Sequence, residues 1–369
     1  MDGLRFDGSA TLYRLYDVGY AIGLDRAAAL LGESLQGRAL PRRLEARAIE
    51  IRNPPLYTTL GSFDIAVGDR KCAVHLTAHL YEFGVCSLQL RTAAERGLTW
   101  GEFTDFGNAL DASKAPLEIM DREVRLLLDR IAGAVERPEI APVSEEYKIF
   151  RVDRIEGVER PVAAELFTDE DLVRLLVGER RRLAPVARRE LVPHRFSYYE
   201  DDLVVLSWES ALVVEPRVED RDVEYVLEFA NAQLLELRLY DLQLDAEVPR
   251  LYDRVAAVRA RRSPRLAGRF RSLLSDVQTF VADVTEIVER VENSLKVIND
   301  VYLARVYSTA LTLFKEDDWQ RSIDRKLGIL RDTYAMLNTE SQTARTEWLE
   351  IAVVVLIVAE IILGLLSRH

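Results

Sequence analysis

Apolar positions in the last third of the chain recur at helical spacing. From Phe270 they alternate in steps of four and three residues, which is the heptad pattern of a coiled coil. These positions are Leu274, Val277, Val281, Val284, Val288, Val291, Leu295, Ile298 and Tyr302. The pattern breaks at 314–318, where Asp318 can cap a second helix. Its apolar face comprises Trp319, Ile323, Leu327, Leu330, Tyr334 and Leu337. We expect a helical hairpin, with an intermolecular coiled coil as the alternative.

The first half of the chain alternates strand and helix patterns instead. Period-two alternation predicts strands and longer periods predict helices. In chain order the strands and helices fall at 11–17, 25–31, 71–83, 85–92, 99–135 and 147–155. This β-α-β-β-α-β order is typical of a ferredoxin-like or related α/β sandwich. Further antiparallel strands are expected at 195–199, 203–208 and 211–214.

The final segment, Trp348 to Leu366, is almost entirely apolar. Its only charged side chains are Glu350 and Glu360, and its length matches the roughly 30 Å hydrocarbon core of a bilayer. We expect a transmembrane tail anchor, with a buried helix of a soluble bundle as the alternative. Ala352 and Ala359 share one face of this helix, and Glu360 beside them favours a protein partner over lipid. These three residues therefore form a candidate intramembrane association surface.

Proline supports a division of the chain. All 12 prolines fall between Pro41 and Pro264. The chain after Pro264 contains none and is therefore suited to long helices. We expect an α+β region at 1–140, a second one at 141–219, a long-helix module at 220–347 and the transmembrane helix at 348–366. The fold class is thus α+β, with a sandwich head, a helical hairpin or coiled coil, and one membrane helix.

Composition limits the setting of this 369-residue chain. The net charge of −12 makes nucleic acid an unlikely general partner. The first residues lack a secretory signal pattern, so we expect the bulk of the chain to be cytoplasmic. Together with the tail anchor, this predicts a single-pass inner-membrane protein. Arginine far outnumbers lysine, which points to a GC-rich bacterial genome.

Four side chains form one candidate for chemistry. Cys72, His75, His79 and Cys86 are residue types that bind zinc, and a metal-dependent enzyme using the first three is one alternative function. In a strand, however, Cys72 and His75 point to opposite faces, which favours ordinary sheet residues. No common catalytic motif is present, so we expect no enzymatic activity and no cofactor.

Two arginine-rich stretches span 179–195 and 250–271. Three interpretations stay open for them: a solvated face, contact with an anionic membrane surface, or RNA binding.

The segment 223–245 predicts a helix with an unusual polar set. Gln233 lies within its apolar stripe, while Glu228, Asn231 and Arg238 share another side. Buried polar groups need hydrogen-bond partners, so these four residues are candidates for a polar network or an interface.

Several motifs together resemble the required-for-meiotic-nuclear-division family, a domain of unknown function. They are LEFANAQLLELRLYD at 227–241, VENSLKVINDVYLARVYSTAL at 291–311, the Trp319 to Leu327 pattern, and the apolar run after Arg345 to Trp348. The resemblance implies a membrane-anchored, oligomeric protein without an established enzymatic activity. The predicted function is a non-enzymatic scaffold or tether that self-associates through its long helices. Its expected partners are the lipid membrane, a second copy and membrane-associated proteins. An RNA- or ribosome-associated factor is the other alternative.

Overall fold

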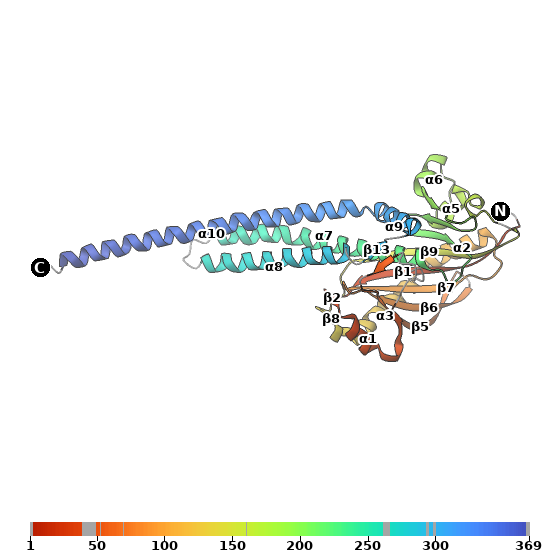
Figure 1. Ribbon diagram of the computed structural model, residues 1–369, viewed down its shortest axis with the longest axis horizontal. Coiled ribbons are helices and arrows are strands. Elements are labelled where there is room, and N and C mark those ends of the chain that lie inside the picture. The colour runs from red at the N-terminus through yellow and green to blue at the C-terminus, as the bar shows by residue number, and fades with distance from the viewer. Residues whose placement is uncertain are drawn as a thin grey trace. The chain divides into compact units, whose positions relative to one another are not determined.

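The computed structural model describes residues 3–38, 49–51, 53–68, 70–159, 161–260, 266–292, 295–297 and 300–366. The chain divides into two compact units. The first comprises Met1–Leu239 and Glu289–Asp317, and the second comprises Tyr240–Val288 and Asp318–His369. Figure 1 labels the helices and strands of both units.

A nine-stranded sheet dominates the first unit. Its strands lie in the order β10 (His194–Phe196), β11 (Leu203–Leu206), β12 (Ser210–Val214), β9 (Ser144–Glu156), β1 (Arg5–Asp17), β7 (Val85–Ala93), β6 (Arg70–Leu80), β5 (Leu56–Val67) and β3 (Leu35–Arg38). Neighbours are antiparallel except β12 and β9, which are parallel. The sheet is therefore wider than the sandwich expected from the sequence.

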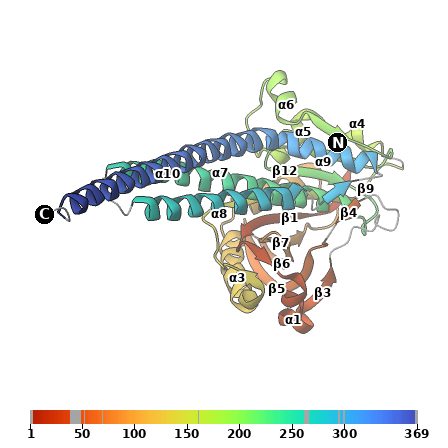
Figure 2. The same ribbon diagram turned by 60° about the vertical axis from the view of Figure 1, so that its left-hand side comes forward.

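One face of this sheet forms the main hydrophobic core. Alternate residues of β6, such as Val74, Leu76 and Ala78, are fully buried on this side, as expected for a strand with one apolar face. Helices cover the face (Figure 2): α1 (Leu24–Leu31), α2 (Trp100–Ala112), α3 (Ala115–Ile131) and α5 (Asp169–Leu176). A capping box of Thr99 and Glu102 begins α2.

Short elements complete the first unit. They are β2 (Ala21–Ile22) with β8 (Val135–Glu136), β4 (Ile49–Ile51) with β13 (Leu295–Val297), and the helices α4 (Ala163–Leu166) and α6 (Pro185–Leu191).

The other face of the sheet contacts the start of α7 (Asp222–Ala260) and α9 (Val301–Leu313). Phe229 of α7 packs edge-on against Tyr81 and Phe83, which lie in the β6–β7 connection. Phe314, directly after α9, packs in the same manner against Tyr147 of β9. These contacts cover only part of the face.

Three helical segments form the second unit: α7 from Tyr240 onward, α8 (Leu266–Glu292) up to Val288, and α10 (Glu316–Leu366) from Asp318 onward. They lie side by side in Figures 1 and 2. Lys326 of α10 pairs with Asp241 and Asp245 of α7 at 2.7 and 2.5 Å. Their buried apolar side chains include Leu244, Leu251, Leu274, Val277, Val284, Ile323, Leu327 and Leu330. The apolar seam is thus covered within one chain.

The predicted continuous helix through Tyr302 is wrong. α8 ends at Glu292, strand β13 follows, and α9 begins only at Val301. The Asp300 carboxylate accepts hydrogen bonds from the backbone N–H groups of Tyr302 and Leu303, which starts a new helix at this point. Heptad spacing in the sequence does not reveal this interruption.

The prediction of a membrane anchor also needs correction. In the part of the chain that the structure describes, no helix is long and apolar enough to cross a membrane. The transmembrane part of the fold class, the tail-anchored description and the single-pass inner-membrane location are therefore wrong.

The candidate association surface of Ala352, Ala359 and Glu360 lies on α10 and stays a prediction. Val353 to Val358 are exposed, as are Ala359 and Glu360, while the side chain of Ala352 lies outside the described residues.

Candidate functional site

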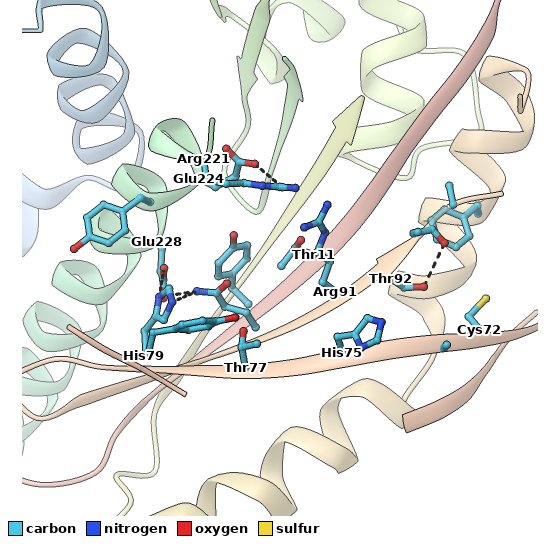
Figure 3. Close-up of a pocket in the computed structure, with 18 of the residues that line it drawn as sticks. Thr11, Cys72, His75, Thr77, His79, Arg91, Thr92, Arg221, Glu224 and Glu228 are labelled. Atoms are coloured by element: carbon cyan, nitrogen blue, oxygen red, sulfur yellow. Dashed lines mark hydrogen bonds and ion pairs between the residues drawn. The ribbon is translucent and has the colours of Figure 1, made fainter. Parts of the chain in front are cut away.

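A cavity of about 980 Å³ lies on the second, polar face of the sheet, within the first unit. Its floor consists of β1, β5, β6 and β7, and its other wall is the segment Glu219 to Glu228 at the start of α7. In Figure 3 the labelled side chains of the sheet rise toward Arg221, Glu224 and Glu228. This volume lies at the upper end of the range typical of small-molecule sites.

Strand alternation explains why this face is polar. The residues of β6 between the buried apolar positions are His75, Thr77 and His79, so all three point into the cavity. Register then aligns partners from neighbouring strands. His75 lies opposite Arg91, which lies opposite Thr11. Thr77 lies opposite Gln89, which in turn faces Tyr13.

Arg91 lies at the first end of the cavity and has few hydrogen-bond partners. It is partly buried, and its hydrogen bond to Ser9 Oγ is long, at 3.4 Å. No carboxylate of the described residues forms an ion pair with it. Burial, together with the positive charges of Arg221 and Arg151, lowers the pKa of Arg91. The guanidinium of Arg221 therefore lies close to that of Arg91, which has few hydrogen-bond partners.

The neighbouring Arg221 is held by an acid. Its Nη1 donates to Glu224 Oε1 at 2.9 Å, and this carboxylate oxygen also accepts from Arg151 at 2.8 Å. Arg151 also pairs with Asp153, so both of these arginines have a carboxylate partner. Among the described residues Arg91 has none, and its guanidinium is therefore suited to an anion.

Arg151 of β9 fixes the wall opposite the sheet. It is 1% exposed and donates to the carboxylates of Asp153 and Glu224. It also donates to the carbonyl oxygens of Glu215, Arg217 and Asp220. Although burial alone lowers the pKa of Arg151, the two acids raise it above its ordinary value. The side chain thus ties the segment before α7 to the sheet.

The second end of the cavity contains a histidine and a glutamate. His79 Nδ1 lies 2.9 and 2.8 Å from the two carboxylate oxygens of Glu228, and 2.8 Å from the amide nitrogen of Gln89. Glu228 can only accept, so it receives a proton that Nδ1 carries, and the Gln89 amide nitrogen beside it is a second donor. The carboxylate therefore sets the orientation of the imidazole.

Tyrosines surround this second end. The rings of Tyr57 and His79 meet edge-on with centroids 5.3 Å apart. Tyr13 and Tyr225 also line the cavity. Burial and the nearby Glu228 raise the pKa of both phenols well above the ordinary value. Both hydroxyl groups are therefore protonated at neutral pH and remain hydrogen-bond donors.

The four polar residues predicted on 223–245 all belong to α7, and the structure gives them different partners. Glu228 contacts His79 in the cavity. Asn231 donates to the carbonyl of Leu227, Gln233 accepts from Tyr307 of α9, and Arg238 pairs with Glu145 of β9. Only Glu228 lines the large cavity.

Cys86 is separated from the other three predicted metal ligands. His75, His79 and Cys72 line the cavity, with Cys72 also packed against the core, whereas Cys86 is buried in the core. Burial raises the pKa of both thiols, that of Cys86 to about 12, which disfavours the thiolate that binds metal. Among the residues described, no group of three His, Cys, Asp or Glu could hold a metal ion.

The arginine-rich stretches are partly paired. In the first stretch, Arg182 and Arg188 pair with Glu170, and Arg195 pairs with Asp169. In the second, Arg250 and Arg254 pair with acids of the helical unit, while 261–265 lie outside the described residues. These five arginines thus have intrachain carboxylate partners.

No sequence pattern led to a predicted role for Arg91, Arg221, Tyr13 or Gln89. A signal was present, because Gln89 and Arg91 interrupt the apolar strand 85–92 at every second position, as His75, Thr77 and His79 do in the preceding strand. Two adjacent strands with a polar face and an apolar face indicate one side that meets solvent or a ligand.

Residues 7–221 match a family model described as "Uncharacterized protein MJ0711, N-terminal domain". The chain is also 24% identical over 196 residues to the Uncharacterized protein MJ0711 of Methanocaldococcus jannaschii, a match that covers 53% of this chain and 58% of that protein. No solved structure matches the chain. The resemblance to the required-for-meiotic-nuclear-division family is therefore wrong, and the archaeal relative contradicts the predicted bacterial origin.

Proposed function

Because the chain belongs to the family of the N-terminal domain of Uncharacterized protein MJ0711, whose matched region contains the sheet floor of the cavity, we propose that this domain binds a small anionic molecule. In this proposal Arg91 is the main anion contact, and Arg221 assists it. The bound group is a phosphate or a carboxylate.

The incomplete hydrogen bonding of Arg91 is the observation that supports the proposal. A guanidinium has five N–H donors, and a half-buried one normally uses several of them. Arg91 has one long hydrogen bond and lies beside a second arginine. An anion between them would accept charge-assisted hydrogen bonds, each worth about 1.5–3 kcal/mol, and would relieve the repulsion.

The predicted scaffold role stays a prediction. The buried apolar residues of α7, α8 and α10 pack against one another within the chain, so they do not supply a surface for self-association. The cavity offers more specific chemistry, and for this reason we base the function on it.

Calorimetric titration of the full chain with inorganic pyrophosphate and with citrate tests the proposal. We expect at least one of them to bind, and Arg91→Gln to weaken that binding at least about tenfold, equivalent to about 1.4 kcal/mol. Arg154→Gln is the matched control, because Arg154 is exposed on β9 and pairs with Glu156 away from the cavity. Binding that is absent, or equal in both variants, would refute the proposal.

A further inference from the structure

The cavity has two chemically different ends on a single sheet face. His75 marks the end next to Arg91, and His79 marks the other end on the same strand. Four residues of strand separate them, which is about 13 Å at the usual rise of about 3.3 Å per residue. Inorganic phosphate at Arg91 could not reach His79, so the second end serves another part of a larger ligand.

The second end is suited to a flat ring that forms hydrogen bonds. Tyr57 is partly exposed there, and the cavity lining places Tyr13 and Tyr225 nearby. Aromatic side chains stack on nucleobases with about 1–3 kcal/mol per base. The His79 imidazole, oriented by Glu228, and the Gln89 amide supply polar groups in fixed positions.

One hydroxyl group, that of Thr77, lies between the two ends, midway between His75 and His79 on β6. The hydroxyl of Thr11 lies opposite Arg91 on β1 and so belongs to the cationic end. Each hydroxyl can both donate and accept a hydrogen bond, as sugar hydroxyls require. The order along the face is thus cationic, hydroxylic and then aromatic.

From this order we infer that the ligand is a nucleotide, with its phosphate at Arg91 and Arg221 and its base at Tyr57 and His79. The inference rests on the proposed anion site and adds the class of molecule that the site takes. A phosphorylated nucleoside presents an anion, a sugar and a flat hydrogen-bonding ring in the same order as the cavity presents their partners.

Calorimetry on the full chain with four nucleoside monophosphates, AMP, GMP, CMP and UMP, tests the inference against ribose 5-phosphate. We expect at least one nucleotide to bind at least about tenfold more tightly than ribose 5-phosphate. Tyr57→Ala should lower the affinity for that nucleotide about tenfold and change the affinity for ribose 5-phosphate by less than about twofold. Tyr57→Phe should restore nucleotide binding, because it keeps the ring. Tyr198→Ala is the control for loss of an exposed tyrosine outside the cavity.

The outcomes separate the two proposals. If ribose 5-phosphate binds in an Arg91-dependent manner and no nucleotide binds more tightly, the nucleotide inference is refuted and the anion site stands. The same holds if Tyr57→Ala weakens both ligands equally. If Arg91→Gln leaves the binding of every phosphorylated compound unchanged, or none of them binds, both proposals fail.

Discussion

Two arginines on the polar face of the same sheet are in opposite situations. Arg151 of β9 is fully buried and bonded to two carboxylates and three carbonyl oxygens, and its pKa is raised. Arg91 of β7 is partly buried, has one long hydrogen bond, and its pKa is lowered. A buried charge whose hydrogen bonds are complete stabilises the fold, whereas one left incomplete beside a cavity is available to a ligand.

The largest expected effect is at Arg151. Arg151→Met should lower the free energy of unfolding by about 3–5 kcal/mol, because Glu224 loses one of its two arginine partners and three carbonyl groups lose their donor in a buried place. Chemical denaturation measures this loss. Arg154→Met, on the same strand but exposed, should change stability by less than about 0.5 kcal/mol. Similar values for the two variants would refute the structural role of Arg151.

Asp17, a buried carboxyl group at the end of β1, should make the stability of the protein depend on pH. Burial, with a smaller contribution from the nearby Glu139, raises the pKa of Asp17 to about 7, although hydrogen bonds with Glu236 and Gly19 act to lower it. Because the folded pKa lies above the unfolded value, the stabilisation is complete below about pH 4 and is lost as the pH rises through about 7.

Between about pH 6 and about pH 8 this loss amounts to about 1 kcal/mol. Asp17→Asn keeps a hydrogen-bond donor but cannot ionise, so its stability should not follow this pH dependence. Denaturation of both proteins at the two pH values measures the difference. Parallel pH profiles for the wild type and the variant would contradict the assignment.

The smallest expected effect on stability is at Arg91. Arg91→Met should leave the free energy of unfolding unchanged or raise it by up to about 1 kcal/mol, since the substitution removes a charge that burial and Arg221 disfavour. A loss of about 2 kcal/mol or more in denaturation experiments would place Arg91 with Arg151 among the structural residues.

The sequence predicted the local part of the cavity better than its assembly. Alternation at 71–83 and 85–92 indicates two paired strands, and the structure contains β6 and β7 there. The register that brings His75, Arg91 and Thr11 into one row depends on contacts between distant segments. The second wall depends on α7 packing back over the sheet, which no local pattern encodes.

In the last third of the chain, heptad spacing predicted the buried positions but not the end of the helix. Heptad spacing correctly marks the buried Leu274, Val277 and Val284, but it continues through Leu295, where the chain forms a strand with β4. Pairing with a distant segment there outweighs helical periodicity. The polar residues of 223–245 were visible as a group, yet only the three-dimensional structure assigns Glu228 to the cavity and Gln233 to Tyr307.

Thermal unfolding of the wild type and Arg91→Met, each with and without the anion that binds in the titration, pyrophosphate or citrate, tests the central claim most directly. Without the anion, we expect the variant to be at least as stable as the wild type. At about 100 times its dissociation constant, this anion should stabilise the wild type by about 2.7 kcal/mol and leave the variant nearly unchanged, so that the order of stability reverses. Equal stabilisation of both proteins, or of neither, would contradict Arg91 as the anion contact.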